Sequence, residues 1–292
     1  MAASPTVGRR RLAAELRALR GTRTGGTVAS ALHWSPAKIS RFELGQTSFP
    51  QEEIEKLLDF YGVTEPRRSQ LLALAADANS RGWWEEYSDV LPAGYMELIG
   101  LEAEAASVVE WNAEAVPGLL QTEEYARQVT AALQSVVFIP PGHVERRTQV
   151  RMTRQRVLTE RNPALQLSVL IDESVLLRKI GSREVMFDQL RHVAEMAELP
   201  NVELRVLALQ SETALLANSF MVLGFGRKDE ASKLGDVVST ESQSGGNLLI
   251  EGEVDTYIYR LIFEALLKAS LSADESRDLI LETARRVWHR ES

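Results

Sequence analysis

Hydroxyl, small and cationic side chains gather in one short segment, residues 33–45 (HWSPAKISRFELG). Ser35 is a favourable helix N-cap, Pro36 a favourable first helical residue and Gly45 a typical helix stop. The outward positions of such a helix are Ser35, Ala37, Lys38, Ser40 and Arg41. Arginine can donate two hydrogen bonds to guanine, and serine or alanine lets a backbone or a thymine methyl group approach closely. The segment therefore offers contacts to base edges and phosphates.

A second helix is expected to hold this one in place. Thr24 can cap a helix that runs to about Leu32, and only two residues then precede the next cap. Ile39 and Phe42, three positions apart, form the buried stripe of the helix over 36–44. This pattern predicts a helix-turn-helix whose second helix lies in the major groove of DNA. The candidate DNA-binding residues are Thr24, Thr27, Ser35, Ala37, Lys38, Ser40, Arg41 and Gln46.

Three further amphipathic helices are expected around this pair, over Val7–Arg20, over 51–61 and after Pro66. Together they predict an all-α, five-helix domain over residues 1–79. This segment has 11 basic and 8 acidic residues, whereas residues 80–292 have 22 basic and 33 acidic residues. A cationic end on an acidic body favours a polyanionic partner. A solvated basic face that balances the acidic body is the alternative.

Residues 80–292 alternate between helical and strand patterns. Buried strands are expected at 166–171 and 202–208 with a helix over 183–198 between them, which predicts a parallel β-α-β unit. Further strands are expected at 106–111, 219–225 and 236–239, with a hairpin turn at 224–226. Further helices are expected over 95–104, 123–134, 143–161, 253–269 and 273–290. We therefore predict a mixed α/β (α+β) C-terminal domain over residues 80–292.

The bulk composition is that of an ordinary globular protein, with 45% hydrophobic and 25% charged residues. No apolar run approaches the ~18 residues of a membrane helix, and the N-terminus lacks the apolar core of a signal peptide. Cysteine is absent, which excludes disulfides and cysteine metal sites. These features predict a cytoplasmic protein without membrane contact.

Residues for catalysis or metal binding do not form a convincing set. The four histidines, at positions 33, 143, 192 and 289, lack ligand spacing, and no nucleotide-binding loop or nucleophile motif occurs. Asp172 and Glu173 follow the strand at 166–171, where α/β folds place functional carboxylates. Glu173 can equally be a first-turn helix residue. We expect no enzyme, no cofactor and no metal; the alternative is an enzyme in the C-terminal domain that the DNA-binding domain targets.

The expected helix over 143–161 is rich in arginine, with six in 19 residues. Arg147, Arg151 and Arg154 fall at i, i+4 and i+7, so they form one stripe. Guanidinium groups bind carboxylates and phosphates with two parallel hydrogen bonds, which predicts a candidate anion-binding or partner-binding face. The alternative is that these arginines form ion pairs with acidic residues of the same domain.

The run WSPAKISRFExG at 34–45 resembles the recognition segment of lambda-repressor/Cro-like regulators, also called the xenobiotic-response-element family. The resemblance implies that Glu43 pairs with an arginine of the first helix, here Arg17 or Arg20. Residues 25–27 (GGT) stand where the family usually has Gln-Glu-Glu at the start of its second helix. We expect a homodimer on an operator whose half-sites lie about one helical turn apart.

Several runs in the C-terminal part resemble the C-terminal domain of actinobacterial regulators classed as antitoxin-like. The matching runs are WWEEYSDVLPAGYMELIGLEAEAASV, VPGLLQTEEYAR, RRTQVRMTRQRVL, IDESVLLRKIGSREVMFDQL and YRLIFEALLKASLSADES. The resemblance implies a transcriptional regulator that partners a small protein encoded nearby. The C-terminal domain is therefore expected to dimerise and to receive a signal from that protein or from a small-molecule ligand.

Overall fold

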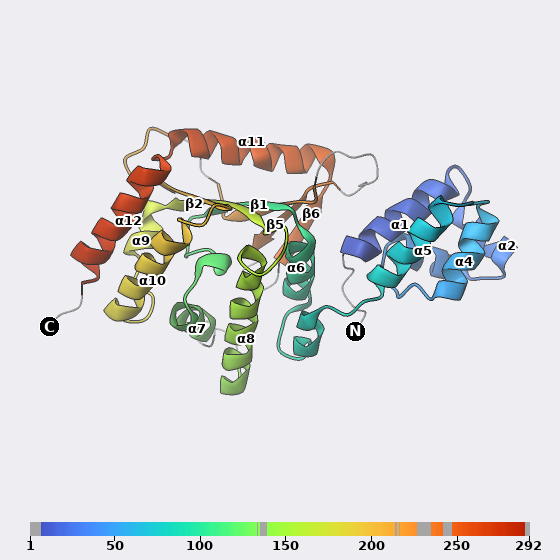
Figure 1. Cartoon of the computed structure of the whole chain (residues 1–292), viewed down its shortest axis with the longest axis horizontal. Helices are drawn as coiled ribbons and strands as arrows, with labels where there is room; N and C mark the ends of the chain where they lie inside the picture. The colour runs from blue at the N-terminus through green and yellow to red at the C-terminus, as the bar shows by residue number, and fades with distance from the viewer. Residues whose placement is uncertain are drawn as a thin grey trace. The chain divides into compact units, whose positions relative to one another are not determined.

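The computed structural model describes residues 7–132, 134, 139–213, 215, 217–226, 235–241 and 247–289. The chain divides into two units, each of which is described by itself (Figure 1). The first unit contains the described residues of Met1–Glu86 together with Met96–Glu104 and Gly235. The described residues of Tyr87–Tyr95, Ala105–Gly226 and Asp236–Ser292 form the second. The predicted domain boundary after residue 79 stays a prediction.

The described part of the first 79 residues is all helical, as predicted. Its helices are α1 (Val7–Arg20), α2 (Gly25–Leu32), α3 (Pro36–Glu43), α4 (Gln51–Phe60) and α5 (Arg67–Ala78). Each contributes apolar side chains to one core, and the predicted anchors Ile39 and Phe42 are both buried in it. Phe42 stacks on Phe49 with ring centroids 5.5 Å apart and meets Trp34 edge-on at 5.8 Å. The core therefore sets the rotation of α3 about its own axis.

The turn between α2 and α3 depends on one left-handed residue, His33, with φ of 55°. The amide of Trp34 reaches back to the carbonyl of Ala29 at 2.8 Å, and the amide of His33 to that of Ser30 at 3.3 Å. These two bonds close α2 with the Schellman geometry, in which glycine usually occupies the left-handed position. The turn is tight because it must bring Ser35 directly to the start of α3.

A six-stranded mixed sheet forms the centre of the second unit among the described residues. The strands are β1 (Ser107–Asn112), β2 (Gln166–Asp172), β3 (Val202–Leu207), β4 (Phe220–Gly224), β5 (Val237–Glu241) and β6 (Asn247–Glu251). Their order in the sheet is β3-β2-β1-β4-β5-β6. β1, β2 and β3 are parallel to one another, whereas β4 pairs antiparallel with β1, β5 with β4, and β6 with β5. The predicted β-α-β unit is confirmed, and β4 pairs antiparallel with β5. The hairpin turn expected at 224–226 stays a prediction, because the connection from β4 to β5 passes through residues 227–234, which lie outside the described residues. Sequence patterns did not predict β6, because its run of three apolar residues does not alternate.

The helices that follow residue 79 in the chain mostly match the predicted ranges. They are α6 (Ala93–Glu104), α7 (Glu123–Ala132), α8 (Pro141–Arg154), α9 (Glu173–Leu177), α10 (Arg183–Met196), α11 (Glu253–Ala269) and α12 (Ala273–Val287). Short 3-10 turns cover Trp83–Tyr87, Gly118–Leu120 and Gln155–Leu158. The prediction that the helix at 143 continues to residue 161 was wrong. The chain tightens into the third 3-10 turn after Arg154, and the amide of Leu165 then bonds to the carbonyl of Val157.

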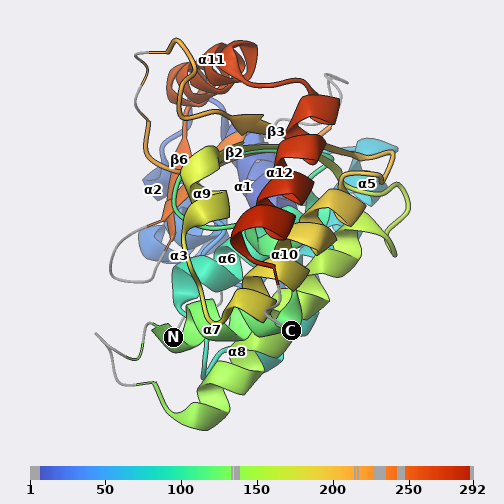
Figure 2. The ribbon, with the colours of Figure 1, turned by 90° about the vertical axis from the view of Figure 1, so that its left-hand side faces the viewer.

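Helices lie on both faces of the sheet. Phe263 and Leu266 of α11 pack on one face, against Trp111, Leu170 and Phe220. Figures 1 and 2 both place α7, α8 and α10 on the opposite side from α11. This arrangement leaves the carboxyl ends of β1, β2 and β3 at one edge of the sheet. No helix in the described ranges is long and apolar enough to cross a membrane.

The turn at His33 generates a stability prediction. A non-glycine residue in the left-handed region destabilises the folded state by roughly 1–2 kcal/mol. Glycine removes this strain, but part of the gain is offset because a glycine makes the unfolded chain more flexible and so more favourable in entropy. His33→Gly is therefore expected to stabilise the helical unit by about 0.5–1 kcal/mol, measured by hydrogen exchange of the α1–α3 amides. His33→Ala keeps the strain and serves as the control. Equal stability of the two variants would contradict the prediction.

Candidate nucleic-acid interface

The two helices of the candidate interface begin with side-chain caps, as predicted. The hydroxyl of Thr24 accepts from the amide of Thr27 at 3.1 Å, and that of Ser35 accepts from the amide of Lys38 at 3.2 Å. Pro36 occupies the first turn of α3. Capping uses acceptor capacity of Ser35, so its hydroxyl proton remains able to donate to a phosphate oxygen. The hydroxyls of Thr24 and Thr27 share a hydrogen bond at 2.9 Å, which leaves one of their two protons able to donate.

The end of α3 is fixed by a second Schellman arrangement and by an ion pair. Gly45, with φ of 65°, follows the helix, and the amide of Gln46 bonds to the carbonyl of Arg41 at 2.9 Å. Arg20 Nε of α1 donates to Glu43 Oε1 at 2.6 Å. The pairing implied by the family resemblance is therefore present, with Arg20 as the partner. This hydrogen bond to Glu43 raises the pKa of Arg20.

A half-buried tyrosine lies beside this ion pair. Burial, with the nearby charge of Glu43, raises the pKa of Tyr61 to about 12. Its hydroxyl therefore stays protonated at neutral pH. The Arg20–Glu43 pair joins α1 to the end of α3, so it resists tilting of α3 against the rest of the helices α1–α5, which together we call the head.

The outer face of this helix pair is open to solvent. All of the predicted DNA-binding residues except Lys38 are exposed, namely Thr24, Thr27, Ser35, Ala37, Ser40, Arg41 and Gln46. The side chain of Arg41 forms no hydrogen bond or ion pair with any residue that the structure describes. It therefore offers an uncompensated guanidinium group with five donors, in the middle of small side chains that do not obstruct it.

Lys38 is placed differently from its predicted neighbours. Its ammonium group donates to Glu53 Oε1 of α4 at 2.6 Å, and it lies 4.2 Å from the centre of the Trp34 ring. The ion pair neutralises its charge, and the ring holds the side chain against the helical core. The sequence did not identify Glu53 as a residue of this site. The signal that could have found it is an acidic side chain in the first turn of α4, which can form an ion pair with a nearby cation.

The arginine stripe of α8 points into its own unit. Arg147 Nε donates to the carbonyl of Val90 at 2.6 Å, and Arg151 Nη1 donates to Gln121 Oε1 at 3.0 Å. Burial lowers the pKa of Arg147, with a further contribution from the charge of Arg151. These two arginines therefore bond to neutral oxygens. They do not present an open anion-binding face, and neither forms the ion pair with another described residue that the alternative interpretation predicted.

Arg154 is the most buried member of the stripe, with 5% of its surface exposed. Its Nη1 donates to the hydroxyl of Tyr95 at 2.7 Å, and the guanidinium lies 5.3 Å from the centre of that ring. Outside the stripe, Arg146 pairs with Asp89, an interaction that lowers the pKa of Asp89. The ion-pair alternative thus holds for this neighbour of the stripe.

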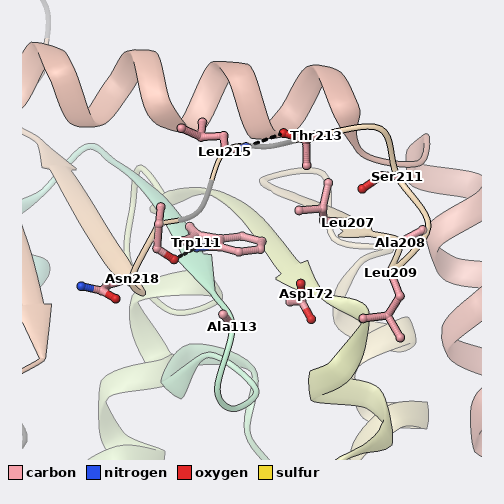
Figure 3. Close-up of a pocket in the computed structure, with 11 residues that line it drawn as sticks. Trp111, Ala113, Asp172, Leu207, Ala208, Leu209, Ser211, Thr213, Leu215 and Asn218 are labelled. Atoms are coloured by element: carbon pink, nitrogen blue, oxygen red, sulfur yellow. Dashed lines mark hydrogen bonds between the residues drawn. The ribbon is translucent and has the colours of Figure 1, made fainter.

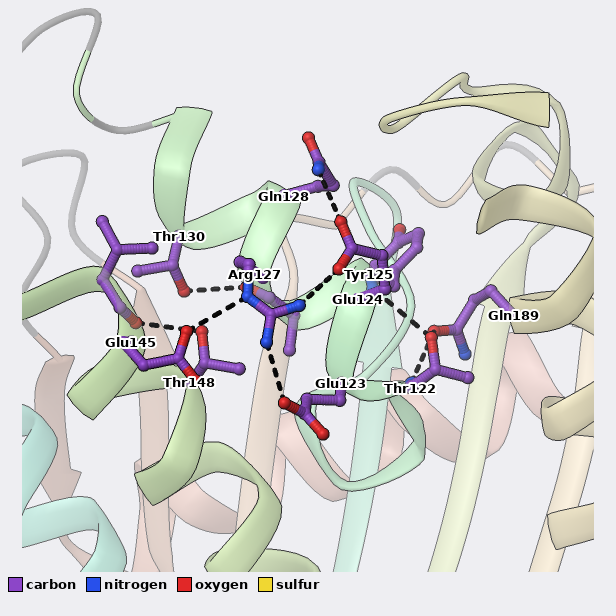
Figure 4. A network of polar contacts seen from close by, with 12 residues as sticks. Thr122, Glu123, Glu124, Tyr125, Arg127, Gln128, Thr130, Glu145, Thr148 and Gln189 are labelled. Carbon is purple, nitrogen blue, oxygen red and sulfur yellow. Dashed lines mark hydrogen bonds and ion pairs between the residues drawn. The ribbon is translucent and has the colours of Figure 1, made fainter. Parts of the chain in front are cut away.

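A second arginine network joins α7 to α8 (Figure 4). Arg127 of α7 reaches Glu145 Oε2 of α8 at 3.2 Å and Glu123 Oε1 at 2.8 Å. The bond to Glu145 contributes most to a raised pKa of Arg127. On the other side of α7, buried Gln189 of α10 accepts from the amide of Thr122 at 2.7 Å. These contacts hold the three helices of this face together.

A pocket of about 400 Å³ lies at the carboxyl ends of the parallel strands (Figure 3). Asp172 and Leu207 end β2 and β3, Trp111 is the penultimate residue of β1, and all three line the pocket. The Trp111 indole N–H is bonded to the carbonyl of Ala217 at 3.1 Å. Except for Asp172, the sequence did not identify these residues, because the pocket exists only once three distant strand ends meet.

The two candidate carboxylates of the enzyme alternative have structural partners. Asp172 Oδ1 caps α9 by accepting from the amide of Ser174 at 2.9 Å. Glu173 is the first residue of α9, as its alternative interpretation predicted, and Glu173 Oε2 accepts from the amide of Leu209 at 2.8 Å. Among the described residues, no group of histidine and acidic side chains is placed to hold a metal ion.

Two family models match the chain. One, described as a helix-turn-helix domain, matches residues 11–71, and the other, described as a domain of unknown function (DUF5753), matches residues 95–282. No curated protein and no solved structure matches. The helix-turn-helix match agrees with the geometry of α2 and α3 and supports a DNA-binding regulator. Because the second match covers more than half of the 292 residues, the chain belongs to the family defined by the domain of unknown function DUF5753.

Proposed function

We propose that this protein is a transcriptional regulator of the lambda-repressor/Cro-like type that binds an operator through α3 as a homodimer. The observation that carries the proposal is the open face of α3, where the Arg41 side chain has no partner among the described residues and is surrounded by small or hydroxylated side chains. Such a face can enter a major groove without steric conflict. The caps at Thr24 and Ser35 and the Arg20–Glu43 pair support it, since they hold α3 rigid for docking.

How much each side chain can contribute to DNA binding depends on whether it is already bonded to another residue of the protein. Arg41 can bond to guanine without losing an internal interaction. Ser35, Ser40, Thr24, Thr27 and Gln46 can supply neutral donors to phosphates, and Ala37 can contact a thymine methyl. Lys38 must first leave Glu53 and Trp34. We therefore assign base recognition chiefly to Arg41, with Lys38 as a held cation that contributes less.

Removing the open guanidinium tests the proposal directly. Arg41→Ala is expected to weaken specific operator binding by about 1–3 kcal/mol, because a bidentate contact to guanine is lost. Affinity is measured by fluorescence anisotropy on an operator found by genome-wide mapping of bound sites. Arg191→Ala, which removes an exposed arginine of α10, is the matched control and should bind normally. Wild-type affinity of Arg41→Ala would show that α3 does not dock as proposed.

Breaking the Lys38–Glu53 pair is expected to strengthen operator binding, whereas Arg41→Ala is expected to weaken it. Glu53→Ala releases the ammonium group, so operator affinity is expected to rise by about 0.5–1 kcal/mol near physiological salt, with a slope of log affinity against log salt steeper by about one. Glu52→Ala removes the same charge from the same exposed turn without releasing Lys38. Equal effects of the two substitutions would mean that repulsion by acidic groups, and not the held lysine, limits binding.

We further propose that the C-terminal domain receives a signal, in the manner of antitoxin-like regulators. The pocket at the ends of β1, β2 and β3 supports a small-molecule input, since α/β folds bind ligands at this edge and its wall is rich in apolar side chains. A small protein encoded nearby is the other proposed input. The arginine stripe contributes little to either input, because Arg147 and Arg151 already donate hydrogen bonds to oxygen atoms of their own unit.

The two inputs can be separated in cells with an operator-driven reporter. Ser211→Trp is expected to fill the pocket and abolish a small-molecule response while purified DNA binding stays normal. Deleting the neighbouring small gene is expected to change the reporter only if the protein input operates. If reporter activity equals that of the wild type at every growth stage, both in the Ser211→Trp strain and in the strain without the neighbouring gene, signal reception by this domain is contradicted.

A further inference from the structure

The pocket at the carboxyl ends of β1, β2 and β3 has one charged side chain among its described lining residues, Asp172 (Figure 3). Leucine and alanine side chains make up more than half of the remaining wall, and no lysine, arginine or histidine is among the described lining residues. Its volume of about 400 Å³ lies in the range of small-molecule sites. The pocket therefore places a single anionic group within a mostly apolar enclosure.

Half of the Asp172 carboxylate is already used by the protein. Its Oδ1 accepts a hydrogen bond from the amide of Ser174 at 2.9 Å and so caps α9. Its Oδ2 forms no hydrogen bond or ion pair with any residue that the structure describes. Because the carboxylate itself occupies the amino end of α9, a second anion at that helix end would be repelled. Oδ2 is left as a charged acceptor for a donor group of a ligand.

The register of the strands sets an aromatic ring on the same face of the sheet as this carboxylate. Trp111 of β1 pairs with Leu170 of β2, and Asp172 lies two residues farther along β2, so both side chains leave the sheet on one side. The Trp111 indole N–H donates to the carbonyl of Ala217 at 3.1 Å, which fixes the ring. A tryptophan ring attracts a cation that lies over its face. Since its N–H is already bonded, the ring has no donor for an anion.

The loop that follows β3 adds negative charge beside the pocket. Glu173 Oε2 accepts from the amide of Leu209, a lining residue, at 2.8 Å. Glu212 is exposed and lies between the lining residues Ser211 and Thr213 in the chain. These acids do not form a metal site, because no group of three acidic or histidine side chains among the described residues is placed to hold an ion. The local charge therefore favours an organic cation.

We propose that this pocket binds a small organic cation, a protonated amine attached to an apolar body. Its ammonium group donates to Asp172 Oδ2 beside the Trp111 ring, and its apolar body packs against the leucine side chains of the wall. A carboxylic acid of the same shape would bring its charge against Asp172 and is excluded. The inference rests on the proposed function for its biological sense, because the amine would be the small-molecule signal.

Isosteric probes test the charge preference. Isothermal titration calorimetry at pH 7 compares tryptamine with tryptophol and indole-3-acetate, and phenethylamine with 2-phenylethanol and phenylacetate. Each amine is expected to bind the wild-type protein about tenfold more tightly than its alcohol, because a charge-assisted hydrogen bond replaces a neutral one. Each acid is expected to show no binding at millimolar concentration. A phosphate buffer is used, since Tris is itself an amine.

Three variants locate the site. Asp172→Asn keeps a side-chain oxygen to cap α9, because asparagine caps helices as well as aspartate does, and it removes the charge. The preference for amine over alcohol is expected to fall to within about twofold in this variant. Asp255→Asn, at an exposed acid in the first turn of α11 that does not line the pocket, is the matched control and should keep the full preference. Ser211→Trp should abolish binding of every probe. Unchanged circular dichroism and thermal melting show that each variant is folded.

Four outcomes overturn the inference. These are no binding of either amine to the wild type, equal binding of amine and alcohol, a preference for amine that survives in Asp172→Asn, and amine binding that survives in Ser211→Trp. Alcohol or acid binding that Ser211→Trp abolishes would overturn only the choice of a cation, and a small-molecule input would stand. Amine binding, together with a reporter that Ser211→Trp leaves unchanged, would support the site and contradict its proposed role in signalling.

Discussion

The burial of Phe42 is the constraint on which the DNA-binding geometry depends. Its ring stacks on Phe49 and meets Trp34 edge-on, so α3 cannot rotate about its axis without breaking aromatic contacts on two sides. Rotation by one residue would carry Arg41, next in sequence, toward the core and would desolvate its charge. An apolar contact inside the head thus decides which polar groups face outward. The hydrogen-bonded caps and the Arg20–Glu43 pair add rigidity to an orientation that packing has already selected.

Net charge is a poor guide to which cations of the head are available. Arg20, Lys38 and Arg68 all have carboxylate partners within the head, whereas Arg41 has none among the described residues. A cation that is already paired must break its ion pair before it can bind a polyanion, which weakens its contribution to binding. An unpaired cation has no such cost. Sequence-specific contact and internal stability are therefore assigned to different side chains of one short helix. In the proposed complex with DNA, an exchange of Lys38 from Glu53 to a phosphate would moderate non-specific affinity.

The second unit has two surfaces of unlike chemistry on one sheet. Its parallel strand ends form a pocket with one carboxylate, and its α11 face presents an apolar stripe with charged ends. The buried side of α11 packs on Trp111, which also lines the pocket. A ligand that shifts Trp111 would therefore also disturb the packing beneath α11.

Local features of this protein are determined by the sequence alone. The limits of α1, the caps at Thr24 and Ser35, the stop at Gly45 and the parallel pairing of β2 with β3 all follow from neighbouring residues and hydrophobic period. Tertiary structure alone decided the partners of long charged side chains. The spacing of Arg147 and Arg151 predicted a stripe, but whether it faced solvent depended on where Val90 and Gln121 came to lie. The same holds for Lys38, for the edge strand β6 and for the pocket. Each requires segments far apart in the chain to meet, and their meeting is set by the packing of the whole core, which no short window of sequence contains.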